Sequence, residues 1–189
     1  MLDEALALIL EDADEHMDKT VDHLRTELSS IRAGRATPTM LQNVRVDYYG
    51  TQTPLNQMAS VSAPQPDLLV VQPWDKSALG DIERAIIAEN LGLNPANDGV
   101  LIRIPVPSLS EERRRDLVKS ARSRGEEAKI AVRNIRRHAK DQVKTTQEEE
   151  SLPEDMRYMA EDELQKLTDA HTDKIDQILN RKEEEIMEV

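Results

Sequence analysis

Apolar residues recur at alternating steps of three and four in three long stretches of the chain, at about 2–32, 111–146 and 154–187. This spacing places them on one narrow face of a helix, so each stretch is predicted to form a long amphipathic helix. At a rise of 1.5 Å per residue, such helices are roughly 45–55 Å long. None can bury its apolar face alone, and we therefore expect the three to pack together as an elongated bundle.

Between the first and second of these helices the pattern becomes that of a small α/β segment. Val44 and Val46 alternate with charged residues, as do Ile102 and Ile104, and this alternation predicts half-buried strands. The other predicted elements are short strands at 57–62 and 68–71 and a helix over 76–89, which is capped by Asp75 and closed at Leu91 by Gly92.

Residues that break helices stand at both junctions of this insert. Gly34 weakens a helix and Pro38 forbids its continuation, while Pro105 and Pro107 end the insert. Both connections are expected at one end of the bundle, where two segments of chain side by side form a hinge. We therefore predict an α+β fold, with a small α/β domain of residues 34–106 inserted into a three-helix bundle of residues 1–33 plus 107–189 and joined to it by a two-strand hinge.

Composition excludes several classes of function. There is no cysteine, and the four histidines lack the spacing of a zinc motif, so no metal or other cofactor is expected. No phosphate loop, Ser-His-Asp order or carboxylate pair stands out, so neither an enzyme nor a small-molecule substrate is expected. No apolar run approaches the ~20 residues that cross a bilayer, and the N-terminus lacks a basic signal region, which predicts a cytoplasmic protein without a membrane partner. Aromatic residues are rare, and we expect Trp74 to fill the core of the small domain.

Charge is distributed unevenly. The chain carries a net charge of −12, but residues 111–146 hold 12 Lys/Arg against 6 Asp/Glu. At 100° per residue, nine cations fall within an arc of about 100° beside the apolar face. They are Arg115, Lys119, Arg122, Lys129, Arg133, Arg136, Arg137, Lys140 and Lys144.

Two interpretations of this basic row stay open from the residues alone. One is a solvated face whose charges pair with acidic neighbours. The other is a site for a polyanion, because few carboxylates of the same helix lie in the row and like charges repel. Arginine suits phosphate, and the lack of stacking aromatics favours structured RNA bound through its backbone.

Several ordered motifs then resemble the ribosome recycling factor family over nearly the whole length. The matching segments are IRAGRA at 31–36, VDYYG at 46–50, TPLNQ at 53–57, NLGLNP at 90–95, IRIP at 102–105, LSEERR at 109–114, GEEAKIAVRNIRR at 125–137 and QKLTD at 165–169. The resemblance implies a factor that binds the 70S ribosome after termination and, with elongation factor G and GTP, splits it into subunits.

The resemblance also implies roles for particular residues. The bundle would lie on large-subunit ribosomal RNA, Arg136 would be central to ribosome binding, and Arg113 would face the ribosome. Arg32 and Arg35 match the family's hinge pattern. The expected contacts are Arg113, Lys119, Arg122, Lys129, Arg133, Arg136, Arg137 and Lys140, and the expected hinge is Arg32, Gly34, Arg35, Pro105 and Pro107.

A coiled-coil adaptor is the alternative from a different class. In that case the long helices would serve oligomerisation, and the basic face would dock an acidic protein. The two hypotheses differ in oligomeric state, because three helices in one chain already satisfy one another and predict a monomer.

Overall fold

The computed structural model describes residues 2–188, which form two compact units. The chain passes from one unit to the other after Ala33 and returns after Ser110. Residues up to 33 and from 111 onward make up the bundle, and residues 34–110 make up the small domain. No helix in this described part is both long and apolar enough to cross a membrane.

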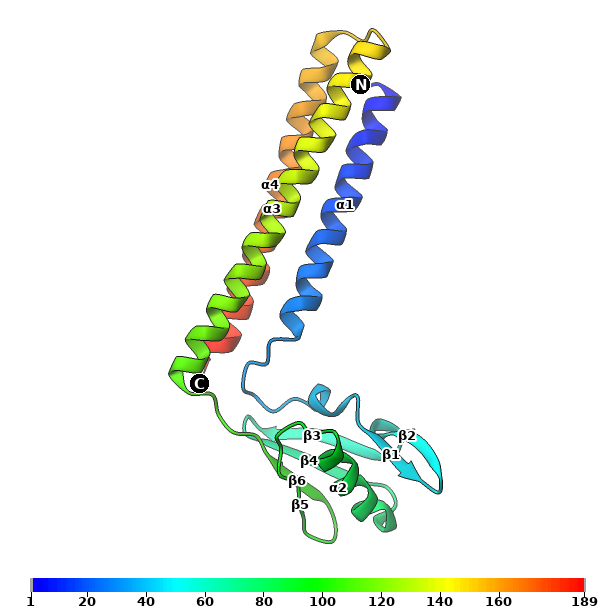
Figure 1. Ribbon diagram of the computed structural model, residues 1–189, viewed down its shortest axis with the longest axis vertical. Coiled ribbons are helices and arrows are strands. Elements are labelled where there is room, and N and C mark those ends of the chain that lie inside the picture. Colours follow the sequence, from blue (N-terminus) through cyan, green and yellow to red (C-terminus); the bar gives the residue numbers. More distant parts are fainter. Residues whose placement is uncertain (1, 189) are drawn as a thin grey trace. The chain divides into compact units, whose positions relative to one another are not determined.

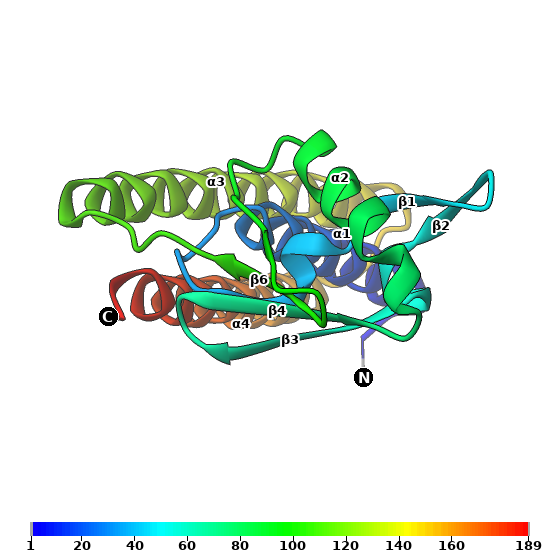
Figure 2. The same cartoon turned by 90° about the horizontal axis from the view of Figure 1, so that it is seen from below.

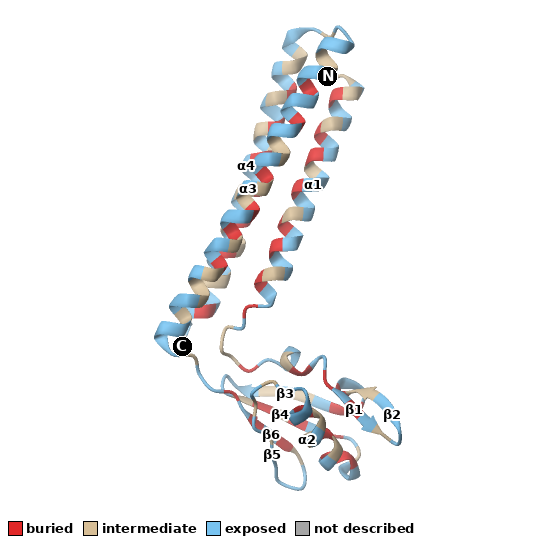
Figure 3. Cartoon of the chain, in the orientation of Figure 1, coloured by how far each residue is buried: buried red, intermediate tan, exposed pale blue. Residues whose placement is uncertain are grey.

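The bundle consists of three long helices that run side by side (Figure 1). They are α1 (Glu4–Ser29), α3 (Glu111–Glu149) and α4 (Glu154–Met187). Buried positions recur along all three helices, as the red segments of the ribbon in Figure 3 show. The core is aliphatic and contains Leu6, Leu10, Ala13, Met17, Val21, Leu24, Leu28, Ile31, Ala121, Ala128, Val132, Ala139, Val143, Ala160, Leu164, Ile175, Leu179 and Ile186.

Local contacts set the ends of these helices. The carboxylate of Asp3 accepts a hydrogen bond from the Ala5 N–H at 2.9 Å and caps α1. At the other end, α1 stops at Ser29, three residues before its predicted end. Helix α3 continues past the predicted Thr146, and Ser151 in the turn after it takes a left-handed conformation with φ 55°. There the Leu152 N–H donates to the Gln147 carbonyl at 3.0 Å, which closes the turn into α4.

The small domain contains two antiparallel sheets and one short α-helix (Figure 2). Strands β1 (Arg45–Tyr48) and β2 (Thr51–Pro54) form a hairpin whose two turn residues, Tyr49 and Gly50, have φ of 50° and 81°. Positive φ at both positions matches the twist of the flanking strands. The second sheet has the order β3-β4-β6-β5, built from β3 (Ala59–Gln65), β4 (Leu68–Pro73), β6 (Ile102–Pro105) and β5 (Ala96–Asn97).

Helix α2 (Leu79–Ala88) and three short 3₁₀ segments, η1 (Pro38–Leu41), η2 (Leu55–Gln57) and η3 (Lys76–Ala78), complete the small domain. Its core is separate from that of the bundle and comprises Ala36, Leu41, Val44, Val46, Leu55, Met58, Ala59, Leu69, Val71, Ala78, Leu79, Ile82, Ile86, Ile102, Ile104 and Val106. The predicted α+β fold, a helical bundle with an inserted sheet domain, is confirmed.

Some sequence-based details of the small domain were wrong. Trp74 does not fill the core but is 69% exposed, because β4 ends at Pro73 and places it at the rim. Strand β3 runs through Pro64, which is possible because β3 is an edge strand. Helix α2 ends at Ala88 instead of Leu91, since Asn90 already has φ 53°.

Two segments of the chain connect the bundle with the small domain. Backbone hydrogen bonds join both of them to the same turn of the small domain. The Ala36 N–H donates to the Pro66 carbonyl at 2.7 Å, and the Val106 N–H donates to the Asp67 carbonyl at 2.8 Å. Pro105 pairs with Leu68 within the sheet, so it is not a linker residue as the sequence suggested. Segments 31–35 and 107–110 lie between these bonds and the helices of the bundle.

Gly34 packs tightly within the first of these segments. Its φ is +75°, and a Cβ added there would lie 2.5 Å from Cγ of Leu109. This contact explains why residues 107–110, which the sequence assigned to the bundle, group with the small domain instead.

Candidate nucleic-acid interface

The basic row lies on the side of α3 that adjoins its core-facing stripe. The buried positions of α3 are Ala121, Gly125, Ala128, Val132, Ala139 and Val143. Most cations of the row are exposed, while Lys129 and Arg136 are half-buried. The structure therefore agrees with the helical wheel, in which the cations of the row lie apart from the buried positions of the same helix.

Carboxylates of α4 neutralise three cations of the row. Arg122 donates to Glu183 through Nε at 2.7 Å and Nη2 at 2.8 Å. Lys129 Nζ lies 2.5 Å from Asp176 Oδ1, and Lys140 Nζ lies 3.2 Å from Glu161 Oε2. The hydrogen bond from Arg122 lowers the pKa of Glu183, which keeps that carboxylate charged.

Glutamates of α3 itself form ion pairs with further cations of the row. Arg133 Nη2 lies 2.9 Å from Glu126 Oε1, and Lys144 Nζ lies 4.0 Å from Glu148 Oε1. Arg115 forms an ion pair with Glu111. Of the two interpretations that the sequence left open, pairing with acidic neighbours thus applies to these cations, and a helical wheel of one helix omits the carboxylates that the next helix supplies.

The remaining cations are the strongest candidates for an external anion. Within residues 2–188, Lys119, Arg136 and Arg137 form no ion pair. Arg133 joins them, because its partner Glu126 is itself 57% exposed and can be exchanged for a phosphate. Arg133, Arg136 and Arg137 fall within about one turn of α3, and Lys119 lies about 27 Å from Arg137 along the axis.

Arg113 differs in place from the other predicted contacts. It is exposed in the first turn of α3, about 160° around the helix from Arg133. It therefore belongs to another face of the bundle than the basic row. Any contact that it makes with a polyanion is separate from that of the row.

Two arrangements in the bundle went unseen in the sequence. Arg124 of α3 donates through Nη1 to the Glu27 carbonyl at 2.6 Å and to Ser30 Oγ at 3.1 Å, so it holds the last turn of α1. His171 of α4 is buried beside Asp14 and Asp18 of α1, with one potential ligand atom of each within 4.8 Å of the others. Separations of 97 and 153 positions along the chain leave no local pattern for either.

A family model described as ribosome recycling factor matches residues 24–187. The ribosome-recycling factor of Salinibacter ruber is 56% identical over 189 residues and covers 100% of both chains. That of Natranaerobius thermophilus is 53% identical over 178 residues, which are 94% of this chain and 97% of the relative.

Comparison with solved structures points to the same family. A solution structure of the ribosome recycling factor superposes with a TM-score of 0.75 at 40% identity, over 100% of both chains. A second match has a TM-score of 0.62 at 46% identity and covers 97% of this chain and 99% of the other. It comes from models of the T. thermophilus ribosome recycling factor and the E. coli elongation factor G bound to the E. coli post-termination complex.

Proposed function

This chain belongs to the ribosome recycling factor family, and we propose that it binds the post-termination ribosome and, with elongation factor G and GTP, splits it into subunits so that mRNA and tRNA are released. It does so without chemistry of its own. The partner is inferred from the related factor that was placed with elongation factor G on a post-termination complex.

One observation carries the RNA-binding part of this proposal. In a chain of net charge −12, the basic row of α3 keeps Lys119, Arg136 and Arg137 free of ion pairs among the described residues. Arginine presents a planar fork of N–H donors that fits phosphate oxygens in a two-point contact. A straight row of cations on a rigid helix suits the backbone of folded ribosomal RNA.

In the proposed mechanism the two units have different roles. The bundle binds large-subunit ribosomal RNA through α3 and competes with contacts between the subunits. Elongation factor G, driven by GTP, then moves the small domain about segments 31–35 and 107–110. Elongation factor G supplies the energy for splitting the ribosome. Gly34 and the neighbouring Arg32 and Arg35 belong to this hinge, together with Pro107, whereas Pro105 is fixed in the sheet.

We also propose that the protein acts as a monomer in the cytoplasm. The apolar stripes of all three helices meet in one core, so the helices of one chain already satisfy one another without the oligomerisation that a coiled-coil adaptor needs. Sedimentation equilibrium at micromolar concentration is expected to give the mass of one chain. A stable dimer or trimer would contradict this proposal.

The decisive experiment compares three arginines that differ in their partners. The double variant Arg136→Gln with Arg137→Gln and the control Arg122→Gln are titrated with 70S ribosomes at several salt concentrations. Each lost phosphate contact is expected to reduce the slope of log affinity against log salt by about one unit. The control should keep most of the slope, because Arg122 is engaged by Glu183.

Equal slopes for the wild type and the double variant would overturn the assignment of these arginines. Splitting of post-termination ribosomes by the wild-type protein, elongation factor G and GTP tests the function itself. No splitting under those conditions would overturn the proposed activity.

A further inference from the structure

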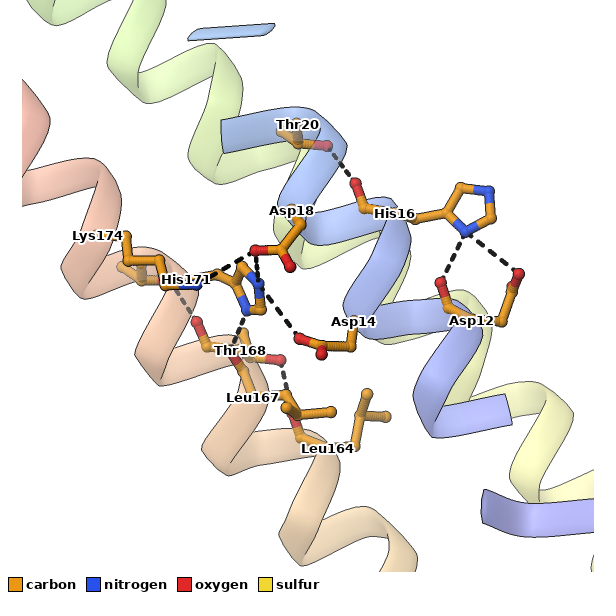
Figure 4. Close-up of polar contacts among 11 residues, drawn as sticks. Asp12, Asp14, His16, Asp18, Thr20, Leu164, Leu167, Thr168, His171 and Lys174 are labelled. Carbon is orange, nitrogen blue, oxygen red and sulfur yellow. Dashed lines mark hydrogen bonds and ion pairs between the residues drawn. The ribbon is translucent and has the colours of Figure 1, made fainter. Parts of the chain in front are cut away.

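Three side chains from two helices of the bundle converge on one point (Figure 4). His171 of α4 is 2% exposed, and its Nε2 lies 2.9 Å from Asp18 Oδ1 and 3.3 Å from Asp14 Oδ1 of α1. The two aspartates are four residues apart, so their carboxylates lie on one face of α1. The three atoms are all within 4.8 Å of one another. The cluster therefore brings one imidazole nitrogen and two carboxylate oxygens together.

The other nitrogen of the His171 ring determines what the cluster can hold. Nδ1 lies 2.7 Å from the Leu167 carbonyl oxygen, which can only accept a hydrogen bond, so Nδ1 carries an N–H. A ring with that single N–H directs the lone pair of Nε2 toward the two carboxylates. Three acceptors then face one another, and such an arrangement is costly without a cation among them. A hydrogen bond from Nδ1 to a backbone carbonyl is also typical of histidines that bind a metal ion through Nε2.

The spacing of the three atoms suits a tetrahedral ion. Zn²⁺ binds nitrogen and oxygen ligands at about 2.0–2.2 Å, which places the corners of its tetrahedron about 3.3–3.6 Å apart. The distance from Nε2 to Asp14 matches this edge, and the distance from Nε2 to Asp18 is shorter by about 0.5 Å. Both aspartate side chains are partly exposed, so they can adjust their rotamers and an ion can enter from the solvent.

Lys174 competes for part of this cluster. Its Nζ lies 3.2 Å from Asp18 Oδ1, the same oxygen that faces His171. The ammonium is carried on a flexible four-carbon stem and the side chain is 48% exposed, so it can move into the solvent. A divalent ion offsets both carboxylates of the cluster, whereas the ammonium offsets only one.

The three ligands are far apart along the chain. His171 and Asp18 are separated by 153 positions, so the cluster has none of the short spacings that characterise zinc motifs. The expectation that no metal binds rested on the spacing of the histidines, which carries no information on ligands from two packed helices.

We propose that His171, Asp14 and Asp18 form a zinc site that links α4 to α1. Nε2 of His171 and one oxygen of each aspartate bind the ion, and a water molecule completes the tetrahedron. One ligand comes from the buried side of the bundle and two come from its surface. The ion can bind in this way only when the two helices are packed, so it stabilises the folded bundle.

Zinc titration of the full chain without an affinity tag tests the site. After treatment with a chelator, calorimetry is expected to show one Zn²⁺ per chain with a dissociation constant in the micromolar range. Asp14→Asn should weaken binding at least ~10-fold, because it removes a ligand that lies outside the apolar core. Asp12→Asn is the matched control, since it is the same substitution on the same helix beside the exposed His16 (Figure 4).

Two outcomes of this titration would overturn the proposal. One is the absence of saturable binding up to about 0.1 mM Zn²⁺, which would show that the cluster holds a proton instead. The other is an equal loss of affinity in Asp14→Asn and Asp12→Asn.

Nitrogen-15 NMR identifies the ligand without any variant that could fail to fold. One equivalent of Zn²⁺ is expected to shift the Nε2 resonance of His171 and to leave the proton on its Nδ1. The rings of His16 and His23, each beside a single carboxylate, should be unaffected. Shifts confined to these exposed rings would show adventitious binding only and would contradict the site.

Thermal unfolding tests the link between the helices, and a lysine variant tests the competition. Zn²⁺ at about 100-fold above its dissociation constant is expected to raise Tm by about 5–10 °C. Lys174→Gln should bind Zn²⁺ severalfold more tightly, because the ammonium no longer occupies Asp18. An unchanged Tm, or an unchanged affinity in Lys174→Gln, would argue against an ion at this cluster.

Discussion

Arg122 of α3 and Glu183 of α4 meet in a two-point ion pair, with Nε 2.7 Å from Oε1 and Nη2 2.8 Å from Oε2. Together with the contacts of Lys129 and Lys140, this pair divides the basic row into two groups. One group holds α3 against α4. The other includes Arg136 and Arg137, which form no ion pair within residues 2–188.

The pair should contribute a modest, pH-dependent part of the stability. Glu183→Gln is expected to lower the free energy of unfolding by about 0.2–1 kcal/mol at pH 7, because the arginine is largely exposed. The pKa of Glu183 is lowered in the folded protein, so this contribution is present above the ordinary carboxyl pKa and is lost as the pH falls through the lowered value. Urea unfolding at pH 7 and at pH 3 checks this, and an equal difference at both pH values would contradict it.

Removing carboxylates from α4 should strengthen the binding of polyanions. The double variant Glu161→Gln with Asp176→Asn releases Lys140 and Lys129 from their ion pairs. We expect a salt slope for 70S binding that is steeper by up to about two units. Asp169→Asn is the control, because that carboxylate accepts a hydrogen bond from Gln165 and releases no lysine. An unchanged slope in the double variant would show that these lysines do not reach phosphate.

Replacement of a helical glycine by alanine usually stabilises a helix, but at Gly125 it should destabilise the protein. A Cβ at this position would lie 2.2 Å from Cδ1 of Leu179, so Gly125→Ala is expected to cost about 1–3 kcal/mol through overpacking. Gly80→Ala in α2 is the matched control, since the nearest atom is the flexible end of Arg84 at 3.9 Å. It should stabilise the protein by about 0.4–1 kcal/mol. Chemical denaturation measures both, and a neutral Gly125→Ala would disprove the close contact.

Trp74 should be exposed to solvent in the folded protein and should contribute little to its stability. It is 69% exposed, so Trp74→Ala is expected to change the free energy of unfolding by less than about 0.5 kcal/mol. Ile86→Ala, at a position that is 1% exposed, should cost about 2–5 kcal/mol. Acrylamide should quench the fluorescence of this single tryptophan readily in the folded protein. Protection from acrylamide would contradict its exposed position.

The hinge proposal can be tested by lengthening one crossing segment. Two glycines inserted between Leu109 and Ser110 leave both cores and the contact of Leu109 with Gly34 intact. Ribosome binding should be retained, while splitting with elongation factor G should fall severalfold, because a slack connection transmits less of the partner's motion. A substitution of Gly34 by proline is unsuitable, since its φ of +75° is closed to proline. Full splitting activity in the insertion variant would argue against this role for the connections.

The elements that depend on local periodicity could be predicted from the amino-acid sequence alone. Steps of three and four produced the three long helices, and alternation at Val44–Val46 and Ile102–Ile104 produced two strands of the small domain. The same periodicity placed the basic row beside the core-facing stripe of α3. Such features can be read from the chain because each depends on residues within a few positions of one another.

Which charged side chains form ion pairs depends on the tertiary structure. Arg122 meets Glu183 across 61 positions, and His171 meets Asp18 across 153 positions. These partners depend on the register in which the helices pack, and a side-chain pattern within one helix does not specify that register. The same holds for Trp74, whose exposure depends on where β4 ends and not on its apolar character. Local patterns therefore predicted most of the fold, whereas contacts between distant segments determine which cations of the basic row are paired.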